Sequence, residues 1–301
     1  MRIAITGATG FVAQYLLPAL TAAGHEPIAL VRNRPGREAG DGTRLYDPED
    51  VASVRAALEG CVAVVNLAGA NVLGGRWTTT FLDTLRSSRL ETTRVLVEAM
   101  AGLEPTPTVL LSASAVGIYG AREADDVCTE ETLGLGTDFL AVLCRDWEAA
   151  ARRAEAAGTR VVCIRTGVVL GRDGGALARM TTPFKLGLGG RIGNGRQIMS
   201  WIHVADLVRL LIFCLEEDVV AGPVNGTAPE PVSNRALTAA LARALKRPAF
   251  LPVPAFALRA LFGRGASVLT TGQRVLPAKS MRHGFRFEHE TIEAAFADMF
   301  G

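Results

Sequence analysis

Short apolar runs alternate along the first half of the chain with segments in which apolar residues recur every three or four positions. The runs predict strands at 3–5, 26–31, 43–46, 62–67, 108–111 and 161–165, and a seventh at 223–226. The segments between them predict helices, among them long ones at 79–100 and 138–157. Strands that alternate with helices form a parallel sheet covered on both faces. The sequence therefore predicts an α/β fold, a doubly wound parallel sheet of about seven strands.

The first predicted strand breaks into a glycine turn with the sequence GATGFVA at residues 7–13. Apolar residues at helical spacing follow, so the stretch predicts a strand, a tight turn and a helix. Such a turn directs backbone N–H groups and the positive end of a helix dipole at a phosphate, and glycines leave room for the ligand. We expect a dinucleotide to contact Gly7, Thr9, Gly10, Phe11 and Val12. The alternative is an ordinary turn whose glycines only supply positive φ angles.

The second predicted strand delivers Arg32, Asn33 and Arg34 at its carboxyl end. An acidic residue at this place accepts hydrogen bonds from the adenosine ribose, whereas arginine attracts a 2′-phosphate. The sequence therefore predicts NADP(H) as the cofactor in preference to NAD(H), with Tyr46 and Asp47 near the adenine. In the alternative interpretation, the two arginines only solvate a loop rich in Arg, Gly and Pro.

The later strands end in small or polar residues, at the edge of the sheet where a ligand crevice opens. Cofactor contacts are expected there from Leu67, Ala68, Gly69, Ser112, Gly167 and Val168. Arg76 lies in the loop before the helix at 79–100. It either meets a phosphate or a substrate acid, or is an ordinary arginine at a helix entry.

The pattern becomes less regular from residue 171 onward. Helices are predicted at 176–184, 234–245, 255–262 and 290–299, which indicates a smaller, mainly helical C-terminal lobe. We divide the chain into a dinucleotide-binding core at 1–170 and a substrate-side and C-terminal lobe at 171–301. Segment 203–227 returns a helix and a strand to the core.

The composition limits the kinds of partner that are expected for this chain. The 32 basic and 30 acidic residues give a net charge of +2, so no nucleic acid is expected. The five cysteines are widely spaced and form no C-x-x-C pair, so neither a disulfide framework nor a metal site is indicated, and a cytoplasmic location is expected. No apolar run is long enough for a membrane span. The expected partners are a small-molecule substrate and, through the exposed faces of the two long helices, a second copy in a homodimer.

The chain carries several short motifs that can be compared with known families as a set. They are Thr6-Gly7-x-x-Gly10-Phe11, Asn66-Leu67-Ala68-Gly69, Ser112-Ala113-Ser114-Ala115-Val116-Gly117, Trp147-Glu148, Gly187-Leu188-Gly189-Gly190, Trp201-Ile202-His203-Val204-x-Asp206, Gly222-Pro223-Val224-Asn225 and Gln273-Arg274-Val275. As a set they resemble the extended form of the short-chain dehydrogenase/reductase superfamily. More closely, they resemble its atypical group of epimerase family proteins, which are similar to NAD-dependent epimerases and dehydratases and carry a C-terminal domain of unknown function. The resemblance implies a Rossmann-type fold and a bound nicotinamide dinucleotide.

The superfamily also implies catalysis by Ser or Thr with a Tyr-x-x-x-Lys pair, in which the lysine lowers the pKa of the tyrosine and holds the nicotinamide ribose. Counting back from Glu148 places Leu140 at the tyrosine position and Cys144 at the lysine position. The usual acid–base route is therefore closed. The candidate catalytic residues are Ser114, as a hydrogen-bond partner of a substrate oxygen, and Tyr119, as a proton donor if its loop swings inward. A packing role for Tyr119 is the alternative.

Two functions follow from the residues and the resemblance. The first is an NADP(H)-binding oxidoreductase or epimerase-like enzyme of unknown substrate, in which the protein orients a cofactor that transfers hydride. The second is a non-catalytic NADPH-binding sensor or scaffold protein. The polar strand end facing a crevice favours the first function, and the missing pair favours the second.

Overall fold

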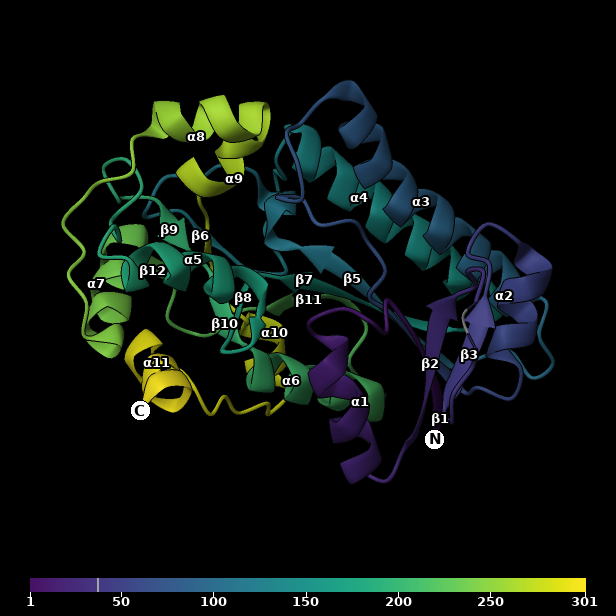
Figure 1. The fold of residues 1–301 in the computed structure, drawn as a ribbon. Coiled ribbons are helices and arrows are strands. Elements are labelled where there is room, and N and C mark those ends of the chain that lie inside the picture. The colour runs from purple at the N-terminus through teal and green to yellow at the C-terminus, as the bar shows by residue number, and fades with distance from the viewer. Residues whose placement is uncertain (37) are drawn as a thin grey trace.

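The computed structural model describes residues 1–36 and 38–301. A seven-stranded parallel sheet forms its centre (Figure 1). Its strands are β1 (Arg2–Thr6), β2 (Glu26–Arg32), β3 (Thr43–Tyr46), β4 (Ala63–Asn66), β5 (Val109–Ala115), β7 (Arg160–Thr166) and β11 (Gly222–Gly226). They lie in the order β11-β7-β5-β4-β1-β2-β3, so the chain reverses its direction of progress between β1 and β4. The predicted doubly wound fold is confirmed, and its switch point lies beside β1.

Helices cover both faces of this sheet (Figure 1). On one face lie α1 (Ala13–Ala22) and α6 (Val204–Glu216), and on the other lie α2 (Val51–Leu58), α3 (Thr79–Ala101) and α4 (Phe139–Arg152). The predicted helix at 138–157 is an α-helix only as far as Arg152, because residues Arg153–Ala157 continue as a 3₁₀ helix, η2.

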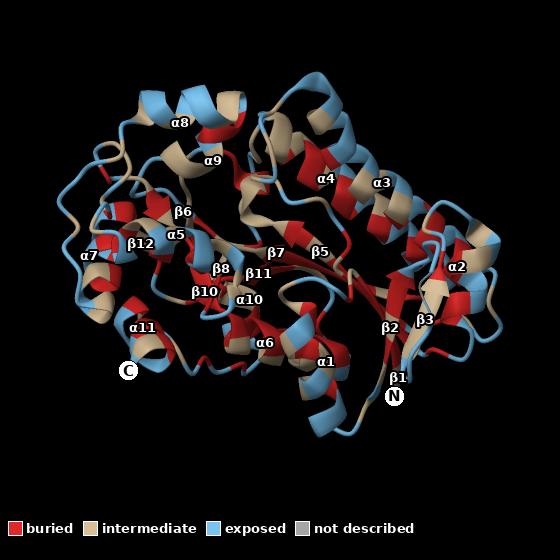
Figure 2. Ribbon diagram, in the orientation of Figure 1, coloured by how far each residue is buried: buried red, intermediate tan, exposed pale blue. Residues whose placement is uncertain are grey.

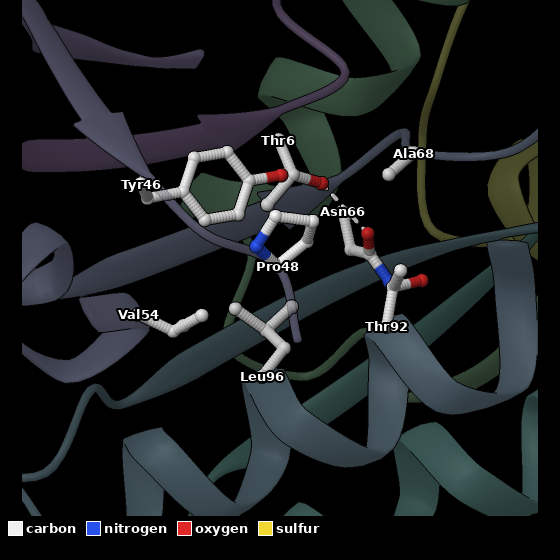
Figure 3. Close-up of a pocket in the computed structure, with 8 residues that line it drawn as sticks. All are labelled: Thr6, Tyr46, Pro48, Val54, Asn66, Ala68, Thr92 and Leu96. Atoms are coloured by element: carbon white, nitrogen blue, oxygen red, sulfur yellow. Dashed lines mark hydrogen bonds between the residues drawn. The ribbon is translucent and has the colours of Figure 1, made fainter. Parts of the chain in front are cut away.

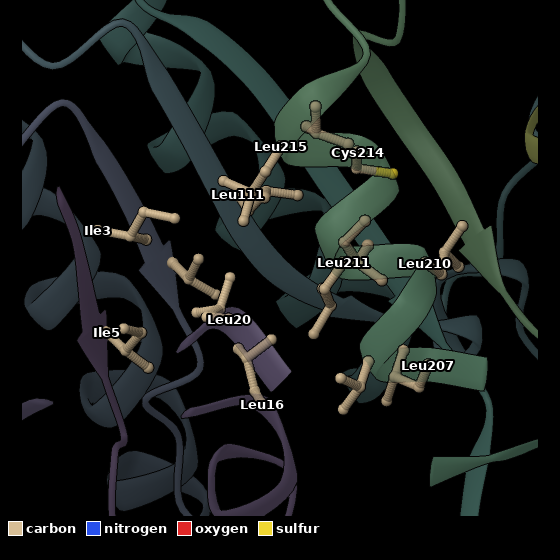
Figure 4. Packing of buried hydrophobic residues seen from close by; sticks show 14 of the residues in the cluster. Ile3, Ile5, Leu16, Leu20, Leu111, Leu207, Leu210, Leu211, Cys214 and Leu215 are labelled. Atoms are coloured by element: carbon tan, nitrogen blue, oxygen red, sulfur yellow. The ribbon is translucent and has the colours of Figure 1, made fainter. Parts of the chain in front are cut away.

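The alternation of side chains along β1 shows how the two helix layers are held. Ile3 and Ile5 point into the cluster formed with α1 and α6, whereas Ala4 points into the cluster formed with α2 and α3. Figure 4 shows Leu16 and Leu20 of α1 packed in the first of these clusters. A strand buried on both faces needs apolar residues throughout, which explains why the strands could be recognised as unbroken apolar runs.

The remaining elements are short helices and strands, of which those after β7 form the mainly helical C-terminal region. The helices are η1 (Val116–Tyr119), α5 (Gly175–Lys185), α7 (Asn234–Leu245), α8 (Ala255–Phe262), η3 (Gly263–Ala266), α9 (Ser267–Thr270), α10 (Ala278–Arg282) and α11 (Ile292–Phe300). The short strands pair as β8 (Val168–Gly171) with β10 (Trp201–His203), β9 (Ile198–Met199) with β12 (Val232–Ser233), and β6 (Val127–Cys128) with β13 (Arg274–Val275). Strands this short carry no readable alternation, so the sequence did not predict them.

This region has an apolar cluster of its own. Trp201 is fully buried and packs with Phe184 of α5, Leu237 of α7 and Phe296 of α11. In contrast, α8 buries none of its residues, and Figure 2 shows it exposed at the outside of the region. Among the described residues, no helix is both long enough and apolar enough to cross a membrane.

Candidate functional site

The glycine turn between β1 and α1 lies directly against the end of β4. Gly7 has a φ of +65°, and a Cβ atom there would lie 2.8 Å from the backbone carbon and oxygen of Leu67. Only glycine allows this approach. Gly10 donates its N–H to the carbonyl of Gly7 at 2.8 Å, and Thr9 and Gly10 are exposed. The turn is therefore closed on its inner side and open to a ligand on its outer side.

The N-terminus of α1 is free to bind an anion. Val12 stands at the N-cap, no described side chain caps the helix, and its first turn carries no acidic residue. The N–H groups of Gln14 and Tyr15 already donate to backbone carbonyls. Those of Phe11, Val12 and Ala13 have no described acceptor and lie at the positive end of the helix dipole. A pyrophosphate group fits this arrangement, because its oxygens can accept from those N–H groups.

Phe11 attaches the turn to the start of α5. Cβ atoms built at Gly171 and Gly174 would lie 2.7 Å and 2.5 Å from atoms of its ring. Its ring also packs edge-on against Tyr15, with centroids 5.5 Å apart. The side chain of Phe11 therefore lies against protein, and only its backbone remains available to a ligand.

A pocket opens where β1, β3 and β4 end beside α2 and α3 (Figure 3). It is lined by Thr6, Tyr46, Pro48, Val54, Asn66, Ala68, Thr92 and Leu96. Asn33 donates its N–H to the carbonyl of Tyr46 at 2.9 Å, which joins the arginine loop to the pocket. Burial raises the pKa of Tyr46, and the nearby positive charge of Arg32 opposes this effect. Arg32 and Arg34 are exposed, so an aromatic and apolar pocket lies beside two accessible cations.

Buried hydrogen bonds hold the strand ends in place. Thr6 donates its hydroxyl to Asn66 Oδ1 at 2.7 Å, and Asn66 donates its amide to Thr93 Oγ1 at 3.0 Å. Trp147 donates its indole N–H to the same oxygen at 3.0 Å. This chain of bonds joins β1, β4, α3 and α4, so the floor of the crevice is fixed without a ligand.

The other predicted cofactor contacts lie in three separate places. Gly167 and Val168 lie where β7 continues into β8, and both pack against Ser200, to whose carbonyl Val168 donates its N–H at 2.8 Å. Ser112 is buried within β5. Arg76 lies against Gly263 at the start of η3, beside the C-terminal region. The structure thus does not bring Arg76 to the glycine turn.

The two candidate catalytic residues belong to one buried polar network. The predicted strand at 108–111 extends to Ala115, because β5 pairs with β7 over its whole length, so Ser114 lies within the strand. Ser114 donates its hydroxyl to Glu148 Oε1 at 2.7 Å, and Arg165 donates to both oxygens of Glu148 at 2.8 and 2.9 Å. Because that proton is directed at Glu148, the oxygen of Ser114 has only lone pairs left for another partner.

Tyr119 is fully buried at the end of η1. Its hydroxyl lies 2.8 Å from Asn225 Oδ1 and 3.0 Å from the carbonyl of Thr129, and it accepts a hydrogen bond from Arg165 Nη1 at 3.0 Å. Burial raises the pKa of Tyr119, and the charge of Arg165 opposes the increase. The geometry matches the packing role, and proton donation to a ligand requires the loop movement that the sequence analysis specified.

Leu140 and Cys144 lie on the side of α4 that faces η1 and β5. Leu140 contacts Gly117, and Cys144 is buried. Burial and the charge of Glu148 raise the pKa of the Cys144 thiol to about 12, although the charge of Arg89 opposes them.

Arg89 was missed by the sequence analysis. Its signal was an arginine on the helix face that also carries the buried residues Leu85 and Leu96.

A second polar cluster joins α6 to α11. The ring of His203 accepts the N–H of Ala205 at its Nδ1, stacks on His289 at 3.9 Å, and lies with its Nε2 3.3 Å from an oxygen of Asp298. With Nδ1 as acceptor, the neutral ring carries its proton on Nε2, on the side that faces Asp298. Burial and the charge of His289 lower the pKa of His203, although the charge of Asp298 opposes them. The described atoms thus use His203 as a helix cap rather than as an open metal ligand.

Comparison with known proteins defines the class. The chain belongs to the NAD dependent epimerase/dehydratase family, whose model matches residues 3–225, and a domain of unknown function (DUF1731) matches residues 253–299. Within this class the chain is similar to the epimerase family protein Mb2239 of Mycobacterium bovis, at 44% identity over 97% of this chain and 95% of that protein. It is 39% identical to human epimerase family protein SDR39U1 over 99% of each chain. A crystal structure of human SDR39U1 (isoform 2) with NADPH has a TM-score of 0.90, at 37% identity and 99% coverage of both chains. The predicted family resemblance is confirmed.

We expect Arg165→Met to lower the free energy of unfolding by about 3–5 kcal/mol, because it leaves Glu148 buried without its cation. Adding Glu148→Leu to this variant should recover part of the loss, since no unpaired charge remains. Urea unfolding measures both changes. The control is Arg243→Met, which breaks an ion pair with Glu293 at 2.9 Å whose side chains are 65% and 62% exposed; it should cost at most about 1 kcal/mol. Equal losses in the two single variants would contradict the assignment.

Burial raises the pKa values of Cys144, Cys163 and Cys214 to about 12, so their thiols stay protonated at neutral pH. Because the thiolate is the reactive form, the native protein should react slowly with Ellman's reagent at about pH 8. All five cysteines should react after unfolding in guanidinium. A Ser87→Cys variant, with its new thiol exposed on α3, supplies the fast-reacting control. Fast reaction of one of these thiols in the native protein would show that the helix or strand that carries it opens.

Proposed function

We propose that this protein is an NADP(H)-binding oxidoreductase or epimerase-like enzyme that acts on a small molecule. The observation that carries the proposal is the pair of exposed arginines, Arg32 and Arg34, beside the pocket that Tyr46 lines. The pocket has a volume of about 10 Å³, which is too small for an adenine, so the adenine would lie over its rim beside Tyr46. The guanidinium groups suit a phosphate on the 2′ position of its ribose. The NADPH in the crystal structure of human SDR39U1 supports this choice of cofactor.

The remaining cofactor contacts follow the edge of the sheet. The open N-terminus of α1 and the turn at Gly7 and Gly10 hold the pyrophosphate. From there the dinucleotide crosses the switch point, so its nicotinamide half lies over the ends of β4 and β5, near Gly69 and Ser112. Bound there, the nicotinamide supplies hydride transfer at its C4 atom.

Ser114 favours a substrate that carries a hydroxyl group over one that carries a carbonyl group at the same place. Its proton is directed at Glu148, both of whose oxygens also accept from Arg165. Ser114 therefore accepts a hydrogen bond from a substrate hydroxyl and does not donate one to a carbonyl. A hydroxyl-bearing substrate, of which sugars are one class, suits this acceptor.

The second candidate is an NADPH-binding sensor or scaffold without turnover. Two observations favour it. Leu140 and Cys144 provide no proton donor and no cation where the superfamily has tyrosine and lysine, and the hydroxyl of Tyr119 is directed into the protein. Both candidates need the cofactor site, and only a measurement of turnover separates them.

The wild-type protein should bind NADPH at least about tenfold more tightly than NADH, because each charge-assisted hydrogen bond to the 2′-phosphate contributes about 1.5–3 kcal/mol. The double variant Arg32→Ala with Arg34→Ala should remove this preference. Titration of the reduced cofactor's fluorescence measures both constants. Lys246→Ala with Arg247→Ala removes two exposed charges at the end of α7 and should leave the preference intact. Equal affinity of the wild type for both cofactors would refute the choice of NADP(H).

Turnover is tested by single-turnover oxidation of bound NADPH in the presence of aldehydes, ketones and nucleotide sugars. For an active compound, Ser114→Ala should slow the reverse reaction, in which the hydroxyl form of the compound reduces bound NADP⁺, at least about tenfold, since it removes the hydrogen bond that Ser114 accepts from the reacting hydroxyl. Ser87→Ala, on the exposed face of α3, should not change the rate. If no compound is reduced and Ser114→Ala changes nothing, the sensor is the better description.

A further inference from the structure

One face of α3 follows the crevice from the pocket toward the end of β4. Leu96 and Thr92 line the pocket beside Tyr46 (Figure 3). Arg89 lies on the same face, one helical turn closer to the start of α3. Its guanidinium lies next to Gly69, where a Cβ atom would come 3.3 Å from Arg89 Cζ. Arg89 therefore lies at the end of β4, one turn of α3 beyond the pocket.

The guanidinium of Arg89 is held firmly but its charge is not neutralised. Its Nη2 donates to the carbonyl of Ala70 at 2.9 Å, its Nη1 donates to the carbonyl of Leu85 at 3.1 Å, and its Cζ lies 5.1 Å above the ring of Trp147. Among residues 1–36 and 38–301, no carboxylate pairs with it, and burial lowers its pKa. A cation withdrawn from water without an anionic partner is costly.

Three of the five N–H groups of this guanidinium have no described acceptor, among them Nε–H. Among the described residues, Arg89 Nε has no hydrogen-bond partner, yet every buried side-chain N or O atom of the described chain has one. The Nε–H group is thus not sealed inside the protein. A fixed cation with a free donor, placed at the carboxyl end of a central strand, is typical of a ligand contact.

We propose that Arg89 donates hydrogen bonds to the nicotinamide ribose of the bound dinucleotide. The inference rests on the proposed function, which places the adenine at Tyr46 and the pyrophosphate at Gly7 and Gly10, and hence the nicotinamide half over the end of β4. The positive charge that the neutral Cys144 cannot supply from α4 comes instead from α3. Ribose hydroxyl oxygens are suitable acceptors for a guanidinium.

The test compares NADPH with adenosine 2′,5′-bisphosphate, which keeps the adenosine half and the 2′-phosphate but lacks the nicotinamide ribose. Arg89→Gln should weaken NADPH binding about tenfold and leave binding of the bisphosphate within about twofold. Arg89→Lys keeps the charge and should recover part of the loss. The matched control is Arg86→Gln, one turn away on α3 and 5.6 Å above the ring of Phe139, which should change neither constant.

The other possible results contradict either the proposed role of Arg89 or the proposed function. Equal weakening of both ligands by Arg89→Gln, or weakening of neither, would show that Arg89 only fastens the loop at Ala70. A wild-type protein that binds neither ligand would refute the proposed function itself, and this inference with it.

A measurement on the wild type covers the case in which Arg89→Gln does not fold. The Nε–H signal of Arg89, assigned by its loss in Arg89→Lys, should shift in the NMR spectrum when NADPH is added and stay in place with the bisphosphate. The same shift with both ligands would overturn the assignment.

Discussion

The arrangement of the crevice depends on the buried ion pair between Arg165 and Glu148. Arg165 donates to both carboxylate oxygens and to the hydroxyl of Tyr119, while Ser114 donates to the same carboxylate. Burial lowers the pKa of Arg165, but the hydrogen bonds and charge of Glu148 outweigh it and raise the pKa above its ordinary value. Tyr119 then reaches Asn225 on β11. One charged contact thus fixes β5, β7, β11, α4 and η1 relative to one another, and such a pair is stable away from water only while every member is satisfied.

The two ends of the crevice are built by opposite principles. At the end where we propose that the adenosine half binds, Arg32 and Arg34 are exposed and take part in no described ion pair, so they remain accessible. At the other end, Ser114, Tyr119 and Arg165 are buried and already bonded to protein groups. Affinity for the cofactor and positioning of a substrate are therefore separable properties, since they depend on different residues at different degrees of solvent access.

Sequence reasoning succeeded where a structural requirement acts on neighbouring residues. The apolar runs gave the strands of the sheet because both of its faces are buried, and the turn at Gly7 was recognisable because a strand, glycines and a helix follow each other directly. It could not predict the partner of Glu148, because Arg165 meets it only after β5 and β7 have paired. Arg89 was missed for a related reason: its position near the end of β4 is a consequence of how α3 packs, and periodicity gives the buried face but not what that face meets.

The contact of Phe11 with Gly171 and Gly174 couples two segments that lie far apart in the sequence. The ring fills the space that side chains at these two glycines would need, and the distances of 2.7 and 2.5 Å leave no margin. A larger residue at either glycine would require a smaller one at position 11, and a smaller residue at position 11 would leave a void. Substitutions at these distant positions are therefore coupled in their effect on stability, so the glycine turn and the segment that opens α5 form one packing unit.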